Sequence, residues 1–232
     1  MCVAKKTYFI TGTDTGVGKT LVSAAILEAA RIAGKRTLAM KPIASGCEVT
    51  PEGLRNDDAL ILQAAATESL SYDAINPVAL EPAIAPHVAA ARAGWSLSAQ
   101  RLTGFCRGMQ TRPGDLMLIE GAGGWRVPLN DRETYAAVPG ALGVPVIVVV
   151  SLKLGCINHA LLTAEAIRND GLTVAGWVAN RPEPETMSCE RDTLEYLLGH
   201  MDAPCLGVLP WLEQATPATL AEHITIDALF EN

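Results

Sequence analysis

TYFITGTDTGVGKT, at residues 7–20, joins the end of a β-strand, a turn rich in glycine and the start of a helix. Tyr8 and its neighbours are β-formers, and glycines follow them at once. Lys19 and Thr20 then open a run whose apolar residues recur at helical spacing. This order predicts a phosphate-binding loop, in which backbone N–H groups and the helix N-terminus hold phosphate oxygens. Lys19 would reach the β- and γ-phosphates, and the Thr20 hydroxyl would bind Mg²⁺.

The spacing of the glycines departs from the usual loop pattern. G-x-x-x-x-G-K-[ST] places its first glycine where this chain has Thr13, and Gly12 comes one residue earlier. The alternative is a glycine turn that only begins a helix. The strand before it and the Lys-Thr pair after it favour a nucleotide-binding loop, one residue longer than usual.

Size and composition narrow the class of protein. A chain of 232 residues fits one α/β domain, which we take as residues 1–232, although two small domains would also fit. Hydrophobic residues make up 49% and charged residues 19%, which indicates a compact globule. The net charge of −7 gives no basic surface, so we expect no nucleic-acid partner. The longest apolar stretch, 144–152, is too short for a bilayer, and no signal-peptide pattern opens the chain, so we expect a cytoplasmic protein without a membrane partner.

Six cysteines are scattered along the chain, and no two form a C-x-x-C pair. This spacing predicts neither a zinc site nor a disulfide framework, so we expect reduced thiols. The six are Cys2, Cys47, Cys106, Cys156, Cys189 and Cys205.

A second strand is expected to end near Lys41. Ligands of open parallel sheets collect at the carboxyl ends of strands, so Lys41 and Ser45 would face the site. An ordinary solvated lysine is an equally good interpretation of Lys41. The polar residues 51–58 predict a loop that enters a helix, where Asp57 or Asp58 would be either the N-cap or a ligand of Mg²⁺.

The apolar strand LMLIE, residues 116–120, ends in Glu120 and runs into the sequence GAGG. A carboxylate at this place can reach a metal, and the glycines let the backbone approach phosphate. The alternative is a solvated carboxylate at the edge of the sheet.

Further strands alternate with helical segments in the rest of the chain. Strands are expected at 144–150, 172–180 and 204–210, helices at 95–108 and 188–200, and an irregular segment at 77–86. The alternation predicts an α/β fold with a mostly parallel sheet and helices on both faces. Residues 155–158, GCIN, mark the start of another helix, with Asn158 as the expected cap, and such a helix end can hold an anion.

Taken together, these segments resemble the dethiobiotin synthetase family of ATP-dependent enzymes in biotin synthesis. The resemblance spans nearly the whole chain in order, at residues 12–20, 41–46, 50–60, 120–125, 153–164, 171–180 and 206–212. It implies a single-domain P-loop NTPase fold and an ATP-dependent cyclo-ligase. In the implied reaction, one amine of 7,8-diaminononanoate takes up CO₂ as a carbamate, ATP converts it to a carbamic-phosphoric anhydride, and the second amine closes the ureido ring. The products are dethiobiotin, ADP and phosphate.

The resemblance also implies roles for individual residues. Lys41, Lys19 and Thr15 would be catalytic, Thr20, Asp58 and Glu120 would bind Mg²⁺, and Ser45 would contact the substrate beside Lys41. The substrate carboxylate would lie at Gly155, Cys156, Ile157 and Asn158, supplied by the second subunit of a homodimer. Contacts to ATP would come from Gly16, Val17, Gly18, Lys19, Thr20, Leu21, Asp58, Glu120, Gly121, Ala122, Gly123, Asn180, Arg181, Leu209, Pro210 and Trp211.

Two departures from the family pattern and two rivals complete the interpretation. Gly16 stands where a glutamate is familiar, and Asp57 adjoins Asp58, which we choose because it directly precedes the Ala-Leu pair that follows it in the family. One rival is a related ATP-dependent amine ligase on the same scaffold. The other is a MinD/ParA-like ATPase switch, whose signature lysine corresponds to Asp14 here.

Overall fold

A parallel sheet of six strands forms the centre of the computed structural model, which describes residues 5–231. Parallel strands need crossover connections, and helices supply them here. The predicted α/β class is therefore confirmed. The strands follow the spatial order β10 (Cys205–Leu209), β9 (Val174–Asn180), β8 (Val146–Ser151), β1 (Lys6–Gly12), β7 (Leu116–Gly124) and β2 (Thr37–Met40).

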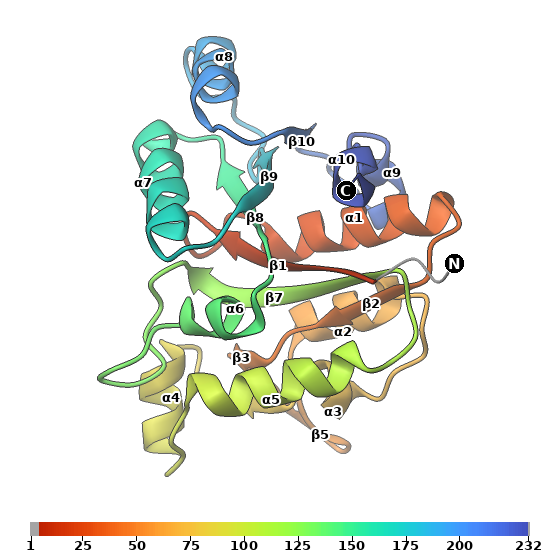
Figure 1. The fold of residues 1–232 in the computed structure, drawn as a ribbon, viewed down its shortest axis with the longest axis vertical. Coiled ribbons are helices and arrows are strands. Elements are labelled where there is room, and N and C mark those ends of the chain that lie inside the picture. The colour runs from red at the N-terminus through yellow and green to blue at the C-terminus, as the bar shows by residue number, and fades with distance from the viewer. Residues whose placement is uncertain (1–4, 232) are drawn as a thin grey trace.

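Helices cover both faces of this sheet. In Figure 1, α5 lies on the near side of the sheet, and α1 and α2 lie beyond it. Strands covered on both faces should be apolar along their whole length, and β8 is buried at every position. The helices are α1 (Lys19–Ile32), α2 (Asp57–Ala65), α3 (Tyr72–Ile75), α4 (Pro86–Arg92), α5 (Ala99–Gln110), α6 (Ala137–Leu142), α7 (Cys156–Asn169), α8 (Glu190–His200), α9 (Pro217–Ala221) and α10 (Asp227–Phe230).

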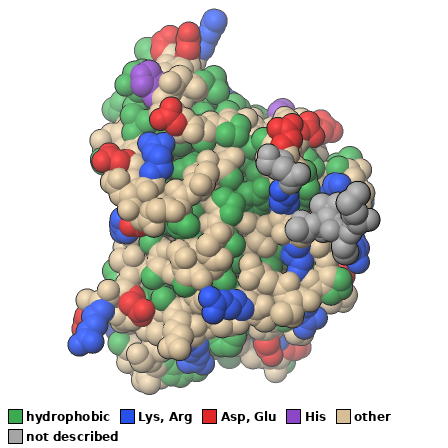
Figure 2. Space-filling view, in the orientation of Figure 1, with side chains coloured by type: hydrophobic (Ala, Val, Ile, Leu, Met, Phe, Trp, Pro, Cys, Tyr) green, Lys and Arg blue, Asp and Glu red, His purple; other side chains and the backbone are tan. Residues whose placement is uncertain are grey.

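The composition bears on the distribution of basic side chains, the length of the helices and the state of the cysteines. Lys and Arg side chains are scattered over the face drawn in Figure 2 and do not gather in one patch there. None of the helices within residues 5–231 has the length and apolar character needed to cross a membrane. Cys2 lies outside the described residues, and the five described cysteines are free thiols.

Two short sheets lie outside the central one, and both correct the sequence analysis. β3 (Ile43–Ser45) pairs in parallel with β6 (Val78–Leu80), so the segment expected to be irregular contains a strand. β4 (Glu48–Thr50) and β5 (Gly53–Arg55) form an antiparallel hairpin where a polar loop was expected. Gly53 has a φ of 107°, which a glycine adopts at no steric cost, and the Thr50 hydroxyl donates to its carbonyl oxygen at 2.8 Å. These two features close the hairpin.

Three helix starts also differ from the expectation. Asn56, not Asp57 or Asp58, caps α2, since its side chain accepts a hydrogen bond from the Ala59 N–H. Gly155, with a φ of 92°, caps α7, so the prediction of Asn158 as its cap is wrong. α5 begins four residues later than predicted because the Ser98 side chain caps it. Because Asn56 caps α2, neither Asp57 nor Asp58 is needed for that role.

Candidate active site

The phosphate-binding loop connects β1 to α1 and has the backbone that its glycines permit. Gly16 and Gly18 have φ values of 74° and 88°, in the left-handed region. The end of β9 fixes the loop from outside, since the Asn180 side-chain amide donates to the Val17 carbonyl oxygen at 2.9 Å. A Cβ atom at Gly18 would collide with that amide. Gly18 therefore serves both the turn and the close approach of Asn180.

Lys19 is buried at the start of α1, and its ammonium donates to the Asp14 carbonyl oxygen at 3.3 Å. Burial lowers the pKa of Lys19, and the negative charge of Glu120 opposes this shift. The Asp14 carboxylate accepts a hydrogen bond from the Thr15 N–H at 2.7 Å, which lowers the pKa of Asp14. Asp14 also pairs with Lys153 at 3.3 Å on the surface. Contacts of the Lys19 and Asp14 side chains with backbone atoms of the loop therefore hold the phosphate loop in place.

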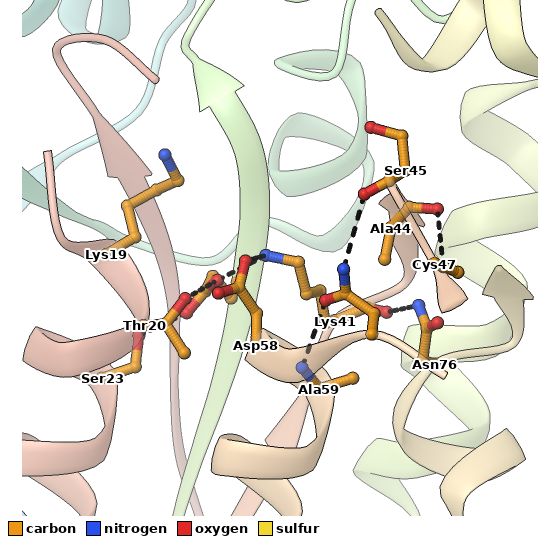
Figure 3. Close-up of polar contacts among 12 residues, drawn as sticks. Lys19, Thr20, Ser23, Lys41, Ala44, Ser45, Cys47, Asp58, Ala59 and Asn76 are labelled. Carbon is orange, nitrogen blue, oxygen red and sulfur yellow. Dashed lines mark hydrogen bonds and ion pairs between the residues drawn. The ribbon is translucent and has the colours of Figure 1, made fainter. Parts of the chain in front are cut away.

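Lys41, directly after β2, lies between two carboxylates (Figure 3). Its Nζ is 2.7 Å from Asp58 Oδ2 and 2.6 Å from Glu120 Oε1. Burial acts to lower the pKa of Lys41, but the attraction of Glu120 and Asp58 outweighs it and raises that pKa. With 5% of its surface exposed, Lys41 is not the solvated lysine that the sequence left open.

Glu120 is 1% exposed, which excludes the alternative of a solvated edge carboxylate. Its Oε1 accepts from the Thr20 hydroxyl at 2.9 Å, and its Oε2 accepts from the Ser23 hydroxyl at 3.0 Å. The sequence analysis missed Ser23. Its signal is a hydroxyl three residues after Thr20, on the same face of the first, largely buried turns of α1.

Hydrogen bonds from neighbouring residues hold the backbone of Lys41, and the sequence analysis missed them as well. The Asn76 side-chain amide donates to the Lys41 carbonyl oxygen at 2.7 Å, and the Tyr72 hydroxyl donates to Asn76 at 3.1 Å. The Lys41 N–H donates to the Ile75 carbonyl oxygen. No local pattern links these residues to Lys41, because the contacts span more than thirty positions. They hold the backbone from which the ammonium reaches the carboxylates.

Two cavities meet at this site. The first, of about 390 Å³, opens over the phosphate loop and reaches Lys41 and Asp58. The second, of about 520 Å³, has mostly apolar walls formed by Ala83, Ile84, Ala85, Pro86, Val127 and Pro128. Both are lined by Thr15, Ser45, Ala122 and Gly123. A cavity over the phosphate loop and a mostly apolar cavity therefore share one wall.

The remaining predicted residues lie in two groups near the carboxyl ends of the strands. Asn180 and Leu209 are neighbours in the sheet, and the Arg181 N–H donates to the Leu209 carbonyl oxygen at 3.0 Å. Pro210 and Trp211 follow β10 directly, and Trp211 is exposed. The structure thus brings the predicted adenine contacts together.

The residues of the predicted carboxylate site at the start of α7 are not among those that line the two cavities. Gly155 and Asn158 are exposed. The Cys156 side chain is buried, and its N–H donates to the Lys153 carbonyl oxygen. This helix end therefore faces solvent in the single chain.

The oxygens of Thr20, Asp58 and Glu120 fit a site for Mg²⁺. They are hard ligands, and the Lys41 ammonium between the two carboxylates shows that the pair already accommodates a positive charge. Nowhere in residues 5–231 do three or more His, Cys, Asp or Glu side chains gather as a metal cluster. Two carboxylates suffice for Mg²⁺, which takes its other ligands from water and phosphates.

Comparisons with known proteins show which families the chain is similar to. The family described as "AAA domain" matches residues 6–219. An ATP-dependent dethiobiotin synthetase BioD from Marinobacter nauticus is 73% identical, over 99% of this chain and 100% of that protein. Proteins of the same name from Cellvibrio japonicus and Pseudomonas aeruginosa are 52% and 53% identical, and each match covers at least 96% of both chains.

Solved structures resemble the chain in fold alone. A MinC:MinD cell division protein complex from Aquifex aeolicus matches with a TM-score of 0.60 and 16% identity, over 97% of this chain and 93% of that chain. A ParA family ATPase from Chlorobium tepidum matches with a TM-score of 0.56 and 12% identity, over 90% and 86%. Both confirm the α/β fold.

Proposed function

The chain belongs to the family of ATP-dependent dethiobiotin synthetases, and on that premise we propose that it closes a ureido ring at the expense of ATP. The substrates are 7,8-diaminononanoate, CO₂ and ATP, and the products are dethiobiotin, ADP and phosphate. One observation carries the proposal: a phosphate cavity and an apolar cavity share a wall beside Lys41. A phosphoryl donor and a long aliphatic amine would meet at that wall.

The residues at the wall suit each step of the reaction. An amine adds to CO₂ and loses a proton, which gives a carbamate anion. A carbamate oxygen then attacks the γ-phosphorus, ADP leaves, and the second amine attacks the carbamoyl carbon and expels phosphate. The Lys41 and Lys19 ammonium groups would stabilise the anionic oxygens, since phosphoryl transfer depends mainly on position and charge. The Thr15 and Ser45 hydroxyls would hydrogen-bond the carbamate end.

The nucleotide would extend from the phosphate loop to the carboxyl ends of β9 and β10. The loop N–H groups, Leu21 on α1 and the glycine segment after Glu120 would contact the phosphates. The adenine ring would lie against Asn180, Arg181 and the residues Leu209, Pro210 and Trp211, which the sheet brings together. Gly16 carries no side chain toward this cavity, so a contact from that position can come only from its backbone.

Mg²⁺ would be held by Thr20, Asp58 and Glu120, and it would neutralise charge on the phosphate oxygens of ATP. Asp58 suits this role because Lys41 attracts it: burial acts to raise its pKa, and the Lys41 charge overcomes that and lowers it. The carboxylate is therefore ionised when a cation arrives.

Glu120→Gln tests this assignment, because glutamine keeps the shape of the side chain and removes its charge. We expect the Mg²⁺ concentration for half-maximal activity to rise about tenfold or more, since one carboxylate ligand is lost. The measurement is a Mg²⁺ titration at fixed ATP. Glu28→Gln, at an ion pair with the exposed Arg31 on the same helix as Thr20, is the matched control. An identical titration for both variants would show that Glu120 is not a metal ligand.

The activity itself is tested by following ADP release with and without the diamine. We expect release to depend on 7,8-diaminononanoate and CO₂ and the ureido product to form in equal amount, detected by mass spectrometry. An ATPase switch would release ADP whether or not the diamine is present. A related amine ligase would accept 1,4-diaminobutane equally well. Either result would overturn the proposal.

We further propose a cytoplasmic homodimer in which α7 of one subunit completes the site of the other. A nine-carbon diamino acid places its carboxylate far from its amines, and the amines belong beside Lys41. The carboxylate then needs a separate anion site, and the N-terminus of a helix provides one. The start of α7 is solvent-exposed and its residues do not line the two cavities of its own chain, which supports a role toward a partner.

Mixing two damaged variants tests the shared site. Asn158→Asp should repel the substrate carboxylate, and Lys19→Ala should damage the phosphate loop, so each alone should be weakly active. A mixed dimer would hold one intact site and one doubly damaged site. We therefore expect part of the activity to return when the variants are mixed under conditions in which subunits exchange. If exchange is demonstrated and activity stays low, each site belongs to one chain.

A further inference from the structure

Asp170 joins the end of α7 to the loop after Glu120. Its Oδ2 accepts a hydrogen bond from the Trp125 indole N–H at 2.7 Å and lies 2.7 Å from Arg126 Nη1. Its Oδ1 accepts from Arg126 Nη2 at 2.9 Å. One carboxylate thus receives three contacts from two adjacent residues of the loop, in the forked geometry that gives arginine pairs their specificity.

The position of Asp170 is unfavourable for the helix that carries it. Asp170 is the C-cap of α7, where the negative end of the helix dipole disfavours an anion. A role in stabilising α7 therefore does not account for this residue. The bonds to Trp125 and Arg126 do, because they offset the repulsion and tie two distant segments together.

Trp125 connects Asp170 to the interior of the protein. It is buried, and its ring packs edge-on against Phe9 at 6.2 Å between centroids. Phe9 lies on β1, three residues before Gly12 and the phosphate loop. At Gly121 a Cβ atom would come within 2.9 Å of the Phe9 ring, so strand and loop are already in close contact there. The loop is therefore fixed at Trp125 and has little freedom on either side.

The segment held in this way is the wall between the two cavities. Ala122 and Gly123 line both cavities, and Val127 and Pro128 line the apolar one. Gly123 has a φ of 64°, and a Cβ atom there would come within 2.8 Å of Val127. Trp125 and Arg126 stand between these two pairs of wall residues. Movement of Trp125 would therefore displace the apolar side of the wall most directly.

We propose that Asp170 is a positioning residue. Through its contacts with Trp125 and Arg126, it holds the wall of the apolar cavity in a fixed position relative to the phosphate loop. The proposal rests on the proposed function, since the apolar cavity is taken to receive the carbon chain of the diamine. The phosphate loop has its own support from Asn180. Loss of Asp170 should therefore affect the diamine more than ATP.

Asp170→Ala removes all three contacts and is the primary test. We expect kcat/KM for the diamine to fall about 10- to 100-fold, since a displacement near 1 Å in a reacting group can cost a hundredfold. KM for ATP should change less than twofold. Asp170→Asn, which retains an acceptor for the indole N–H, should recover part of the loss. Trp125→Phe, which keeps an aromatic ring of smaller size and removes the N–H, should reproduce part of the defect if Asp170→Ala does not fold.

Asp202→Asn is the matched control, because it breaks an exposed ion pair with Arg168, in the last turn of the same helix, without contacting the loop. It should match the wild type in both KM values. If the Asp170 and Trp125 variants match this control, or raise KM for ATP and the diamine equally, the proposal is wrong. A wild-type protein without diamine-dependent ADP release would instead refute the proposed function. Nucleotide binding, measured with a fluorescent ATP analogue, should stay unchanged in all variants.

Discussion

Replacing Lys41 by methionine is expected to destabilise the folded protein by about 3–5 kcal/mol. The variant leaves the buried Glu120 with hydrogen bonds only from the Thr20 and Ser23 hydroxyls, and with the Lys19 charge as its remaining positive neighbour. Two hydroxyl donors do not replace an ammonium at 2.6 Å in a region from which water is excluded. The free energy of unfolding, measured by urea titration, reports the loss.

Two further variants make this expectation specific. Lys153→Met removes a lysine from an exposed pair with Asp14, where both side chains are about half exposed, so we expect a change below about 1 kcal/mol. The double variant Lys41→Met with Glu120→Gln should recover part of the stability, because the uncompensated charge is gone. If the two changes simply add, the ammonium and the carboxylate do not stabilise each other.

Lys19→Ala is expected to lower kcat by about 10²–10³ at saturating ATP and diamine, the usual effect of removing one preorganised donor from a transition state. Lys19 is 8% exposed beside the phosphate loop, so its charge is screened less there than it would be at the surface. Single-turnover kinetics would separate the chemical step from ATP binding. Lys19→Met, which keeps most of the side-chain volume, should show the same loss. Turnover close to that of the wild type in both variants would remove Lys19 from the mechanism.

The sequence predicted the parts of the site that local patterns encode. Strand, glycines, Lys19 and helix follow one another within 14 residues, so their chemistry can be recognised without knowledge of the fold. Glu120 was predictable because the carboxyl ends of parallel strands meet at one edge. Its burial and its pairing with Lys41 depend on β2 and β7 lying side by side. The order of the residues along the chain does not show which strands are neighbours in the sheet.

The errors have local physical causes. Glycine at the start of α7 caps by its left-handed backbone, whereas we gave the cap to the asparagine because of its side chain. The hairpin β4–β5 has strands of only three residues with mixed exposure, which leaves no alternating pattern to detect. Asp170 was invisible because its partners lie 44 and 45 positions away along the chain. A residue whose role depends on contacts with distant parts of the chain can be identified only from the structure.

The four charges at the base of the phosphate cavity have a consequence for which form of the nucleotide is accepted. Lys19 and Lys41 contribute two positive charges, and Asp58 and Glu120 contribute two negative ones, so this base is neutral as a whole. A nucleotide that arrives alone finds no surplus of positive charge to balance its phosphates, and two carboxylates repel it. A cation that arrives alone is likewise repelled by two ammonium groups. The pair, entering together, carries less net charge than the nucleotide alone, so a neutral base favours the complex of nucleotide and metal over the free nucleotide.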